Sequence, residues 1–146
     1  MRQVVLVVES NNHAGKFFKS CLARNGYYAI ATDDADKALK LVRAWQPDLV
    51  MIDMHLADNA TEWLIKSIKN APDSSPRIVL TACDNLEKTS ALASQVDAVI
   101  PKPLDCWRIA AAIGELLNKS ACIGAKGEFI ASVGRHVKQV SAFPVA

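Results

Sequence analysis

The sequence has no long hydrophobic run and no large excess of either charge. Its longest early apolar run, Val4–Val8, has five residues, whereas a membrane-spanning helix needs about 18. The same run is too short for a signal-peptide core, and no small-residue cleavage site follows it. Lys and Arg total 17 against 15 Asp and Glu, which excludes a disordered or strongly nucleic-acid-like chain as a description of the whole. We therefore expect a soluble, cytoplasmic protein that does not contact a membrane.

Cysteine and histidine are also few, and neither type is clustered. The four cysteines form no Cys-x-x-Cys pair; they are Cys21, Cys83, Cys106 and Cys122. The three histidines show no spacing typical of metal ligands. We therefore expect reduced thiols without disulfides, since nothing points to secretion, and we expect no zinc site.

Glycine is scarce as well, with 6 in 146 residues. The segment after the first apolar run, Glu9–Gly15, contains one glycine and an acid that would repel phosphate. It is therefore unlike the phosphate loop of a flavin- or dinucleotide-binding enzyme. A P-loop and a Gly-x-Ser-x-Gly elbow are absent too. An independent metabolic enzyme is thus a competing class that the sequence does not favour.

The residues that are present predict one α/β domain. Hydrophobic residues make up 51% of the chain, enough for a sizeable core. Five short β-rich runs are expected as strands, at Val4–Val8, Tyr28–Thr32, Leu49–Asp53, Arg77–Ala82 and Ala98–Lys102. Three are nearly continuous aliphatic runs, which is typical of parallel strands covered by helices on both faces. The prediction is a (βα)5 doubly wound, five-stranded parallel sheet of the flavodoxin-like type over residues 1–118.

Five segments with helical periodicity lie after these strands. The first carries apolar residues at Ala14, Phe18, Cys21 and Leu22, and Asn11 or Asn12 could cap it. The second begins at Asp33 or Asp34, and the third ends before Pro72. The fourth, over residues 85–94, has the weakest pattern, and the fifth follows Pro103.

Residues 119–146 differ from the rest in charge. They hold four basic residues and one acidic residue, a net charge of +3. Their apolar residues at Phe129, Val133, Val137 and Val140 allow a short basic helix, although Gly134 weakens it. The segment is expected to be such a helix or a linker, and it is too short for a complete DNA-binding domain.

Polar residues follow several of the predicted strands. Glu9 and Ser10 follow the first, Asp53 ends the third, Thr81 lies near the end of the fourth, and Lys102 ends the fifth. Because ligands bind at the carboxyl ends of parallel strands, these side chains are expected to share one pocket. Paired carboxylates attract a divalent cation. A carboxylate can also attack a phosphoryl group whose oxygens are held by a hydroxyl and an ammonium.

The chain resembles the receiver domain of two-component response regulators over residues 1–118. The residues that carry the resemblance are Val7–Ser10, Leu49–Met54, Val79–Ala82 and Ile100–Pro103. The resemblance implies that Asp53 accepts a phosphoryl group from a sensor histidine kinase or a phosphotransfer protein. It implies that Mg²⁺ binds Glu9, Asp53 and the backbone carbonyl of His55. It also implies that Thr81 and Lys102 bind the phosphoryl oxygens and that the peptide before Pro103 is cis.

The sequence departs from the receiver pattern at several positions. Ser10 stands where most receivers have a second acid, so magnesium binding is expected to be weak. Val99 replaces the usual aromatic switch residue. Ala57 and Thr61 replace a proline and a glycine in the loop after the acceptor, and His55 is expected to be an incidental surface side chain.

These departures leave two interpretations open. The first is a working receiver that changes its affinity for an unknown downstream protein. The second is a degenerate receiver that binds partners without phosphorylation. Val99 and Trp107 are candidate interface residues, a homodimer is an open alternative, and nucleic-acid binding would need a further domain.

Overall fold

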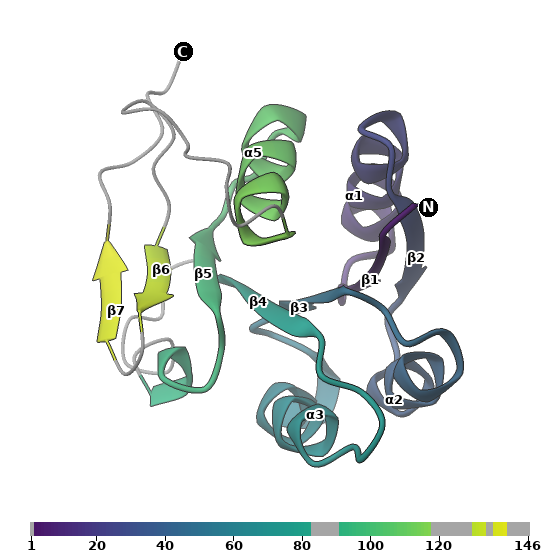
Figure 1. Ribbon diagram of the computed structural model, residues 1–146, viewed down its shortest axis with the longest axis vertical. Helices are drawn as coiled ribbons and strands as arrows, with labels where there is room; N and C mark the ends of the chain where they lie inside the picture. The colour runs from purple at the N-terminus through teal and green to yellow at the C-terminus, as the bar shows by residue number, and fades with distance from the viewer. Residues whose placement is uncertain (1, 83–90, 118–129, 134–135, 140–146) are drawn as a thin grey trace.

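The computed structural model describes residues 2–82, 91–117, 130–133 and 136–139. Its centre is a parallel sheet in the order β2-β1-β3-β4-β5 (Figure 1). The strands are β1 (Val4–Val8), β2 (Tyr28–Thr32), β3 (Leu49–Asp53), β4 (Arg77–Ala82) and β5 (Ala98–Pro101). The predicted five-stranded parallel sheet is therefore confirmed, and only β5 ends earlier than expected, one residue before Lys102.

Helices cover both faces of this sheet (Figure 1). One face carries α1 (Asn12–Arg24) and α5 (Cys106–Leu117), and the other carries α2 (Ala35–Trp45) and α3 (Ala60–Lys69). The carboxylate of Asp34 caps α2 by accepting from the amide of Lys37 at 3.1 Å. Alternate residues of the central strands point to opposite faces, so the sheet is buried in two apolar clusters. Because helices cover both faces of the sheet, the side chains on both faces of the central strands are apolar, and these strands appear in the sequence as nearly continuous aliphatic runs.

The fourth predicted helix lies largely outside the described residues. Residues 91–93 are helical, and they precede β5. Within the described ranges, no helix combines the length and apolar character needed to span a bilayer.

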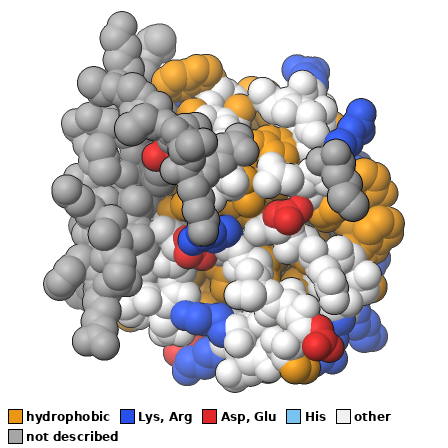
Figure 2. Space-filling model, in the orientation of Figure 1, with side chains coloured by type: hydrophobic (Ala, Val, Ile, Leu, Met, Phe, Trp, Pro, Cys, Tyr) orange, Lys and Arg blue, Asp and Glu red, His pale blue; other side chains and the backbone are white. Residues whose placement is uncertain are grey.

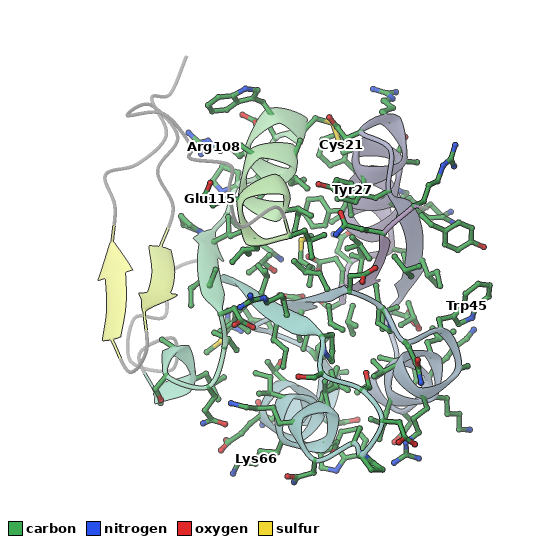
Figure 3. The ribbon with its side chains drawn as sticks, viewed as in Figure 1. Cys21, Tyr27, Trp45, Lys66, Arg108 and Glu115 are labelled. Atoms are coloured by element: carbon green, nitrogen blue, oxygen red, sulfur yellow. A yellow bond between two sulfur atoms is a disulfide. The ribbon has the colours of Figure 1, made fainter. Side chains whose placement is uncertain are left out.

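The expectation that all cysteines are reduced is wrong. Cys21 and Cys106 form a disulfide with their Cα atoms 5.3 Å apart. The two residues are 85 positions apart in sequence, but α1 and α5 pack side by side on one face of the sheet (Figure 3). The pairing was missed because it depends on tertiary packing and not on a local Cys-x-x-Cys spacing.

The C-terminal segment contains strands where a short helix or a linker was expected. β6 (Ile130–Val133) pairs antiparallel with β5, and β7 (His136–Gln139) pairs antiparallel with β6. The sheet thus has seven strands in total among the described residues. Valine is β-branched and favours strands over helices, and Gly134 separates the two strands in the sequence. The helical spacing of the valines was therefore a misleading signal.

One pair of aromatic residues lies on the surface away from the carboxyl ends of the strands. Tyr28, the first residue of β2, stacks on Trp45, the last residue of α2, with ring centroids 5.5 Å apart. Both side chains are nearly half exposed. Figure 2 shows hydrophobic side chains gathered along the side of the molecule where β2 and α2 lie.

Candidate functional site

The predicted site residues meet at the carboxyl ends of the parallel strands. Glu9 directly follows β1, Asp53 ends β3, and Lys102 directly follows β5. Thr81 in β4 is the register partner of Asp53. Glu9 and Asp53 are each 2% exposed and Thr81 is 1% exposed. Three polar side chains of a small domain are thus held out of water at one edge of the sheet.

Lys102 connects the two buried acids. Its Nζ atom lies 2.8 Å from Oε1 of Glu9 and 3.2 Å from Oδ1 of Asp53. The peptide bond from Lys102 to Pro103 is cis, as the resemblance implied. Because both carboxylates are buried, a single partly exposed ammonium compensates two desolvated negative charges.

Both carboxylate oxygens of Asp53 accept further hydrogen bonds. Oδ1 accepts from the backbone amide of His55 at 3.1 Å. Oδ2 accepts from the backbone amide of Ser10 at 3.2 Å and also from the Ser10 hydroxyl. These donors fix the orientation of the carboxylate before any ligand binds.

The pKa values of Glu9 and Asp53 shift in opposite directions in this environment. Burial raises the pKa of Glu9 above its ordinary value, and the neighbouring Asp53 raises it further. Burial also acts to raise the pKa of Asp53, but hydrogen bonds with Glu9 and Ser10 outweigh it. The His55 amide and the Lys102 charge act in the same direction, so the pKa of Asp53 lies well below its ordinary value. Asp53 is therefore an anion at neutral pH, as a carboxylate nucleophile must be.

The pKa of Lys102 is set by the same contacts. Burial acts to lower it, but the hydrogen bond to Glu9 and the charges of Asp53 and Glu9 outweigh that effect and raise it. Lys102 therefore keeps its positive charge at neutral pH, when it faces both acids.

The oxygen donors at the site suit a hard cation such as Mg²⁺, but they are few. Glu9 and Asp53 supply two carboxylates, and Ser10 supplies only a hydroxyl that is already bonded to Asp53. In the part of the chain that the structure describes, no three His, Cys, Asp or Glu side chains are grouped as metal ligands. The side-chain oxygen of Asn11 does not fill the gap, since it caps α1 by accepting from the amides of His13 and Ala14.

The remaining candidate residues differ in exposure. The Thr81 hydroxyl donates to the carbonyl of Ile52 at 3.5 Å. Val99 is 1% exposed and packs in the core, which corrects the expectation that it contacts a partner: as an apolar residue of an inner strand, it is covered by a helical layer. Trp107 is 55% exposed and stays a predicted interface residue. The side chain of His55 is exposed, as expected.

Thr61 is a buried polar residue that the sequence marked only as a departure. It lies in the first turn of α3 and is 3% exposed. Its hydroxyl lies 2.8 Å from the carbonyl oxygen of Asp53 and 3.1 Å from that of Met54. A hydroxyl residue eight positions after the acceptor was the available signal, but the sequence does not reveal where it points.

An open hollow of about 690 Å³ adjoins Lys102. Its lining is mostly apolar and comes from α1 and from the segment after β5: His13, Ala14, Phe17, Phe18, Lys102, Pro103 and Leu104. Phe17 is 44% exposed there. The buried carboxylates thus have an apolar surface beside them on which another molecule could rest.

A family model described as the response regulator receiver domain matches residues 5–114. Response regulator MprA of Mycolicibacterium vanbaalenii is 27% identical over 125 residues, which are 85% of this chain and 54% of that protein. Two-component response regulator PhoP of Pseudomonas aeruginosa is 30% identical over 118 residues, 80% of this chain and 52% of that protein. The chain therefore spans about half the length of the curated relatives it matches.

Solved structures agree with this fold. A CheY-like response regulator receiver domain from Methylobacillus flagellatus superposes with a TM-score of 0.69 at 22% identity, covering 80% of this chain and 99% of that one. A response regulator from Thermotoga maritima gives a TM-score of 0.70 at 17% identity, covering 81% of this chain and 99% of that one. At these identities, the similarity establishes the fold alone.

Proposed function

This chain belongs to the response regulator receiver domain family, and we propose that it is a working receiver with Asp53 as its phosphoacceptor. The phosphodonor is a sensor histidine kinase or a histidine phosphotransfer protein. The observation that carries the proposal is the setting of Asp53: a buried carboxylate at the carboxyl end of β3 that accepts from the backbone amides of Ser10 and His55 and lies 3.2 Å from Nζ of Lys102. Glu9 differs from Asp53 in that burial raises the pKa of Glu9 above its ordinary value.

The transfer exchanges one phosphorus bond for another. An oxygen of Asp53 forms a bond to phosphorus while the bond from phosphorus to the donor's histidine nitrogen breaks, and that nitrogen keeps the electron pair. Lys102 supplies positive charge to the phosphoryl oxygens, and Thr81 supplies a hydroxyl. When bound, Mg²⁺ would add charge neutralisation, held by Glu9, Asp53 and the His55 carbonyl. With Ser10 in place of a second acid, we expect this binding to be weak.

The hollow beside Lys102 is where we place the incoming donor. Its apolar lining includes the half-exposed Phe17, and it opens next to the residue that bridges both acids. A helical surface of the donor could rest there and bring its phosphohistidine to Asp53. The cytoplasm, where such donors have their kinase domains, is the compartment that this proposal requires.

The competing proposal is a degenerate receiver that binds a partner without phosphorylation. The observation in its favour is that the Ser10 hydroxyl occupies Oδ2 of Asp53, at the position where most receivers have an acid. In either case the domain acts by binding and not as a metabolic enzyme. An output through nucleic acid would need a domain beyond these residues, and Trp107 is the exposed candidate for contact with a downstream protein or a second copy.

Phosphorylation by a small donor separates the two proposals. The protein would be incubated with acetyl phosphate and Mg²⁺, and its intact mass measured, with Asp53→Asn as the control. We expect a gain of one phosphoryl group in the wild type and none in the variant. If the wild type gains nothing even at high magnesium, the degenerate receiver is the correct proposal.

A further inference from the structure

The structure describes four buried polar or charged side chains, and one of them has no role in the site so far. Three are Glu9, Asp53 and Thr81, and the fourth is Thr61. A buried hydroxyl is costly unless it is hydrogen-bonded, and Thr61 is bonded to the backbone of the phosphoacceptor segment itself.

The hydroxyl of Thr61 connects both ends of the turn that follows Asp53. It donates toward the carbonyls of Asp53, at 2.8 Å, and Met54, at 3.1 Å. It also accepts from the amide of Leu56 at 3.4 Å. These contacts surround His55, whose own amide donates to Oδ1 of Asp53 at 3.1 Å. The hydroxyl therefore contacts the backbone on both sides of His55, the residue of this turn whose amide donates to the reacting carboxylate.

Thr61 is not serving as an ordinary helix cap. Asn59, the residue before α3, makes no side-chain hydrogen bond to the first amides of the helix. A hydroxyl in the first turn could therefore have served to cap the helix. The Thr61 hydroxyl instead contacts residues five to eight positions earlier in the chain. The connection it spans also contains two consecutive non-glycine residues with left-handed backbone, Asp58 (φ 58°) and Asn59 (φ 54°). Such residues persist only where surrounding contacts hold them.

We propose that Thr61 is a positioning residue for phosphoryl transfer: its hydroxyl holds the backbone of residues 53–56 so that the His55 amide stays on Oδ1 of Asp53. The inference deepens the proposed function and rests on it for the reaction, but the contact itself can be tested without phosphorylation. Thr61 touches neither the carboxylate nor the site of the phosphoryl group, so it acts through the loop alone.

Two variants and a control isolate the effect of the hydroxyl. Thr61→Val removes it while keeping the shape, and Thr61→Ser keeps it while removing a methyl group. Ile68→Val is the matched control, because Ile68 is buried in the same helix but lines a surface depression formed by residues from the opposite end of the strands. If Thr61→Val does not fold, Thr61→Ala replaces it. Thermal unfolding of each variant shows which are folded at the assay temperature.

The first measurement is amide hydrogen exchange at His55 and Leu56 by NMR. We expect exchange about ten-fold faster in Thr61→Val and near the wild-type rate in Thr61→Ser and Ile68→Val. Unchanged exchange in Thr61→Val, or equal acceleration in Ile68→Val, would overturn the inference. This measurement tests whether the hydroxyl holds the loop even if the wild type proves not to accept phosphate, so its failure is distinct from the failure of the proposed function.

The second measurement is the rate of phosphorylation over a range of acetyl phosphate concentrations. We expect the maximal rate of Thr61→Val to fall about ten-fold with little change in the half-saturating concentration, because the defect lies in the orientation of Asp53 and not in donor binding. Thr61→Ser should restore the rate to within about two-fold of wild type. A loss that Ile68→Val shares, or that Thr61→Ser does not rescue, would mean a merely structural role.

Discussion

The hydroxyl of Ser10 donates a hydrogen bond to Oδ2 of Asp53, the same oxygen that accepts the backbone amide of Ser10 at 3.2 Å. The residue that replaces the expected second acid therefore binds the phosphoacceptor instead of repelling it. This arrangement keeps Asp53 ionised with one fewer negative charge in the pocket. It also leaves Mg²⁺ with two side-chain carboxylates, which makes the affinity for the metal the property most altered by this substitution.

Restoring the acid should restore magnesium binding. We expect Ser10→Asp to bind Mg²⁺ at least about ten-fold more tightly than wild type, because a third carboxylate adds charge and a hard oxygen ligand. Calorimetric titration with MgCl₂ measures the dissociation constants directly. Ser10→Asn, which has the same shape without the charge, should stay near the wild-type affinity. Equal affinities for Ser10→Asp and wild type would show that Ser10 does not limit metal binding.

Removing the charge of Glu9 should stabilise the metal-free protein. Burial raises the pKa of Glu9 from an ordinary 4.5, so the folded state binds this proton more tightly than the unfolded state does. The contribution of this proton to the free energy of unfolding is complete below pH 4.5, and it is lost as the pH rises through the pKa of Glu9 in the folded state. Glu9→Gln keeps a neutral side chain at every pH. We therefore expect it to unfold at a higher temperature than wild type at pH 7 in EDTA.

The pH dependence is the control for this effect. The gain in melting temperature of Glu9→Gln should shrink as pH is lowered to 4, where the wild-type carboxyl is itself protonated. The substitution also removes a partner of Lys102, which opposes the gain. A lower melting temperature for Glu9→Gln at pH 7 would mean that this ion pair outweighs the cost of burying the charge.

The elements and the site were predictable from sequence because both depend on local patterns plus one topological rule. Continuous aliphatic runs identified the buried parallel strands, and the first four match the observed bounds. The rule that strand ends converge then placed Glu9, Asp53 and Lys102 together. No pattern in the sequence indicates where a side chain points beside an irregular connection, so the hydrogen bonds of Ser10 and Thr61 were not foreseen. Both depend on distances within loops.

Contacts between segments that are distant in the sequence could not be predicted either. Cys21 and Cys106 become neighbours only because the helices that carry them pack on the same face. The segments 130–133 and 136–139 were expected to form a short helix or a linker, because Phe129, Val133, Val137 and Val140 have helical spacing. Their pairing with β5 and with each other makes them strands.

The receiver unit should fold and work without its C-terminal segment. All the residues of the acidic site, the adjoining hollow and the predicted interface precede residue 118, and the pairing of β6 with β5 involves only Ala98 with Ala131 and Val99 with Ile130. We expect a chain ending at residue 118 to keep its circular dichroism spectrum. It should be phosphorylated by acetyl phosphate at a rate within about two-fold of the full chain. An unfolded truncated chain would show that residues 119–146 are part of the domain, contrary to the predicted boundary.

The disulfide between Cys21 and Cys106 should contribute measurably to stability. It closes a loop of 85 residues, and the chain-entropy model gives about 4.6 kcal/mol for a loop of that length. For a domain of this size, that corresponds to a fall in melting temperature of about 15 °C on reduction. Peptide mapping without reductant should recover the linked peptides, and calorimetry with and without dithiothreitol measures the shift.

The variant Cys21→Ala/Cys106→Ala is the control, because its melting temperature should not respond to reductant. If wild type and variant respond alike, the stabilising bond is elsewhere; if no linked peptide is found, the two thiols are reduced neighbours and the predicted shift is wrong.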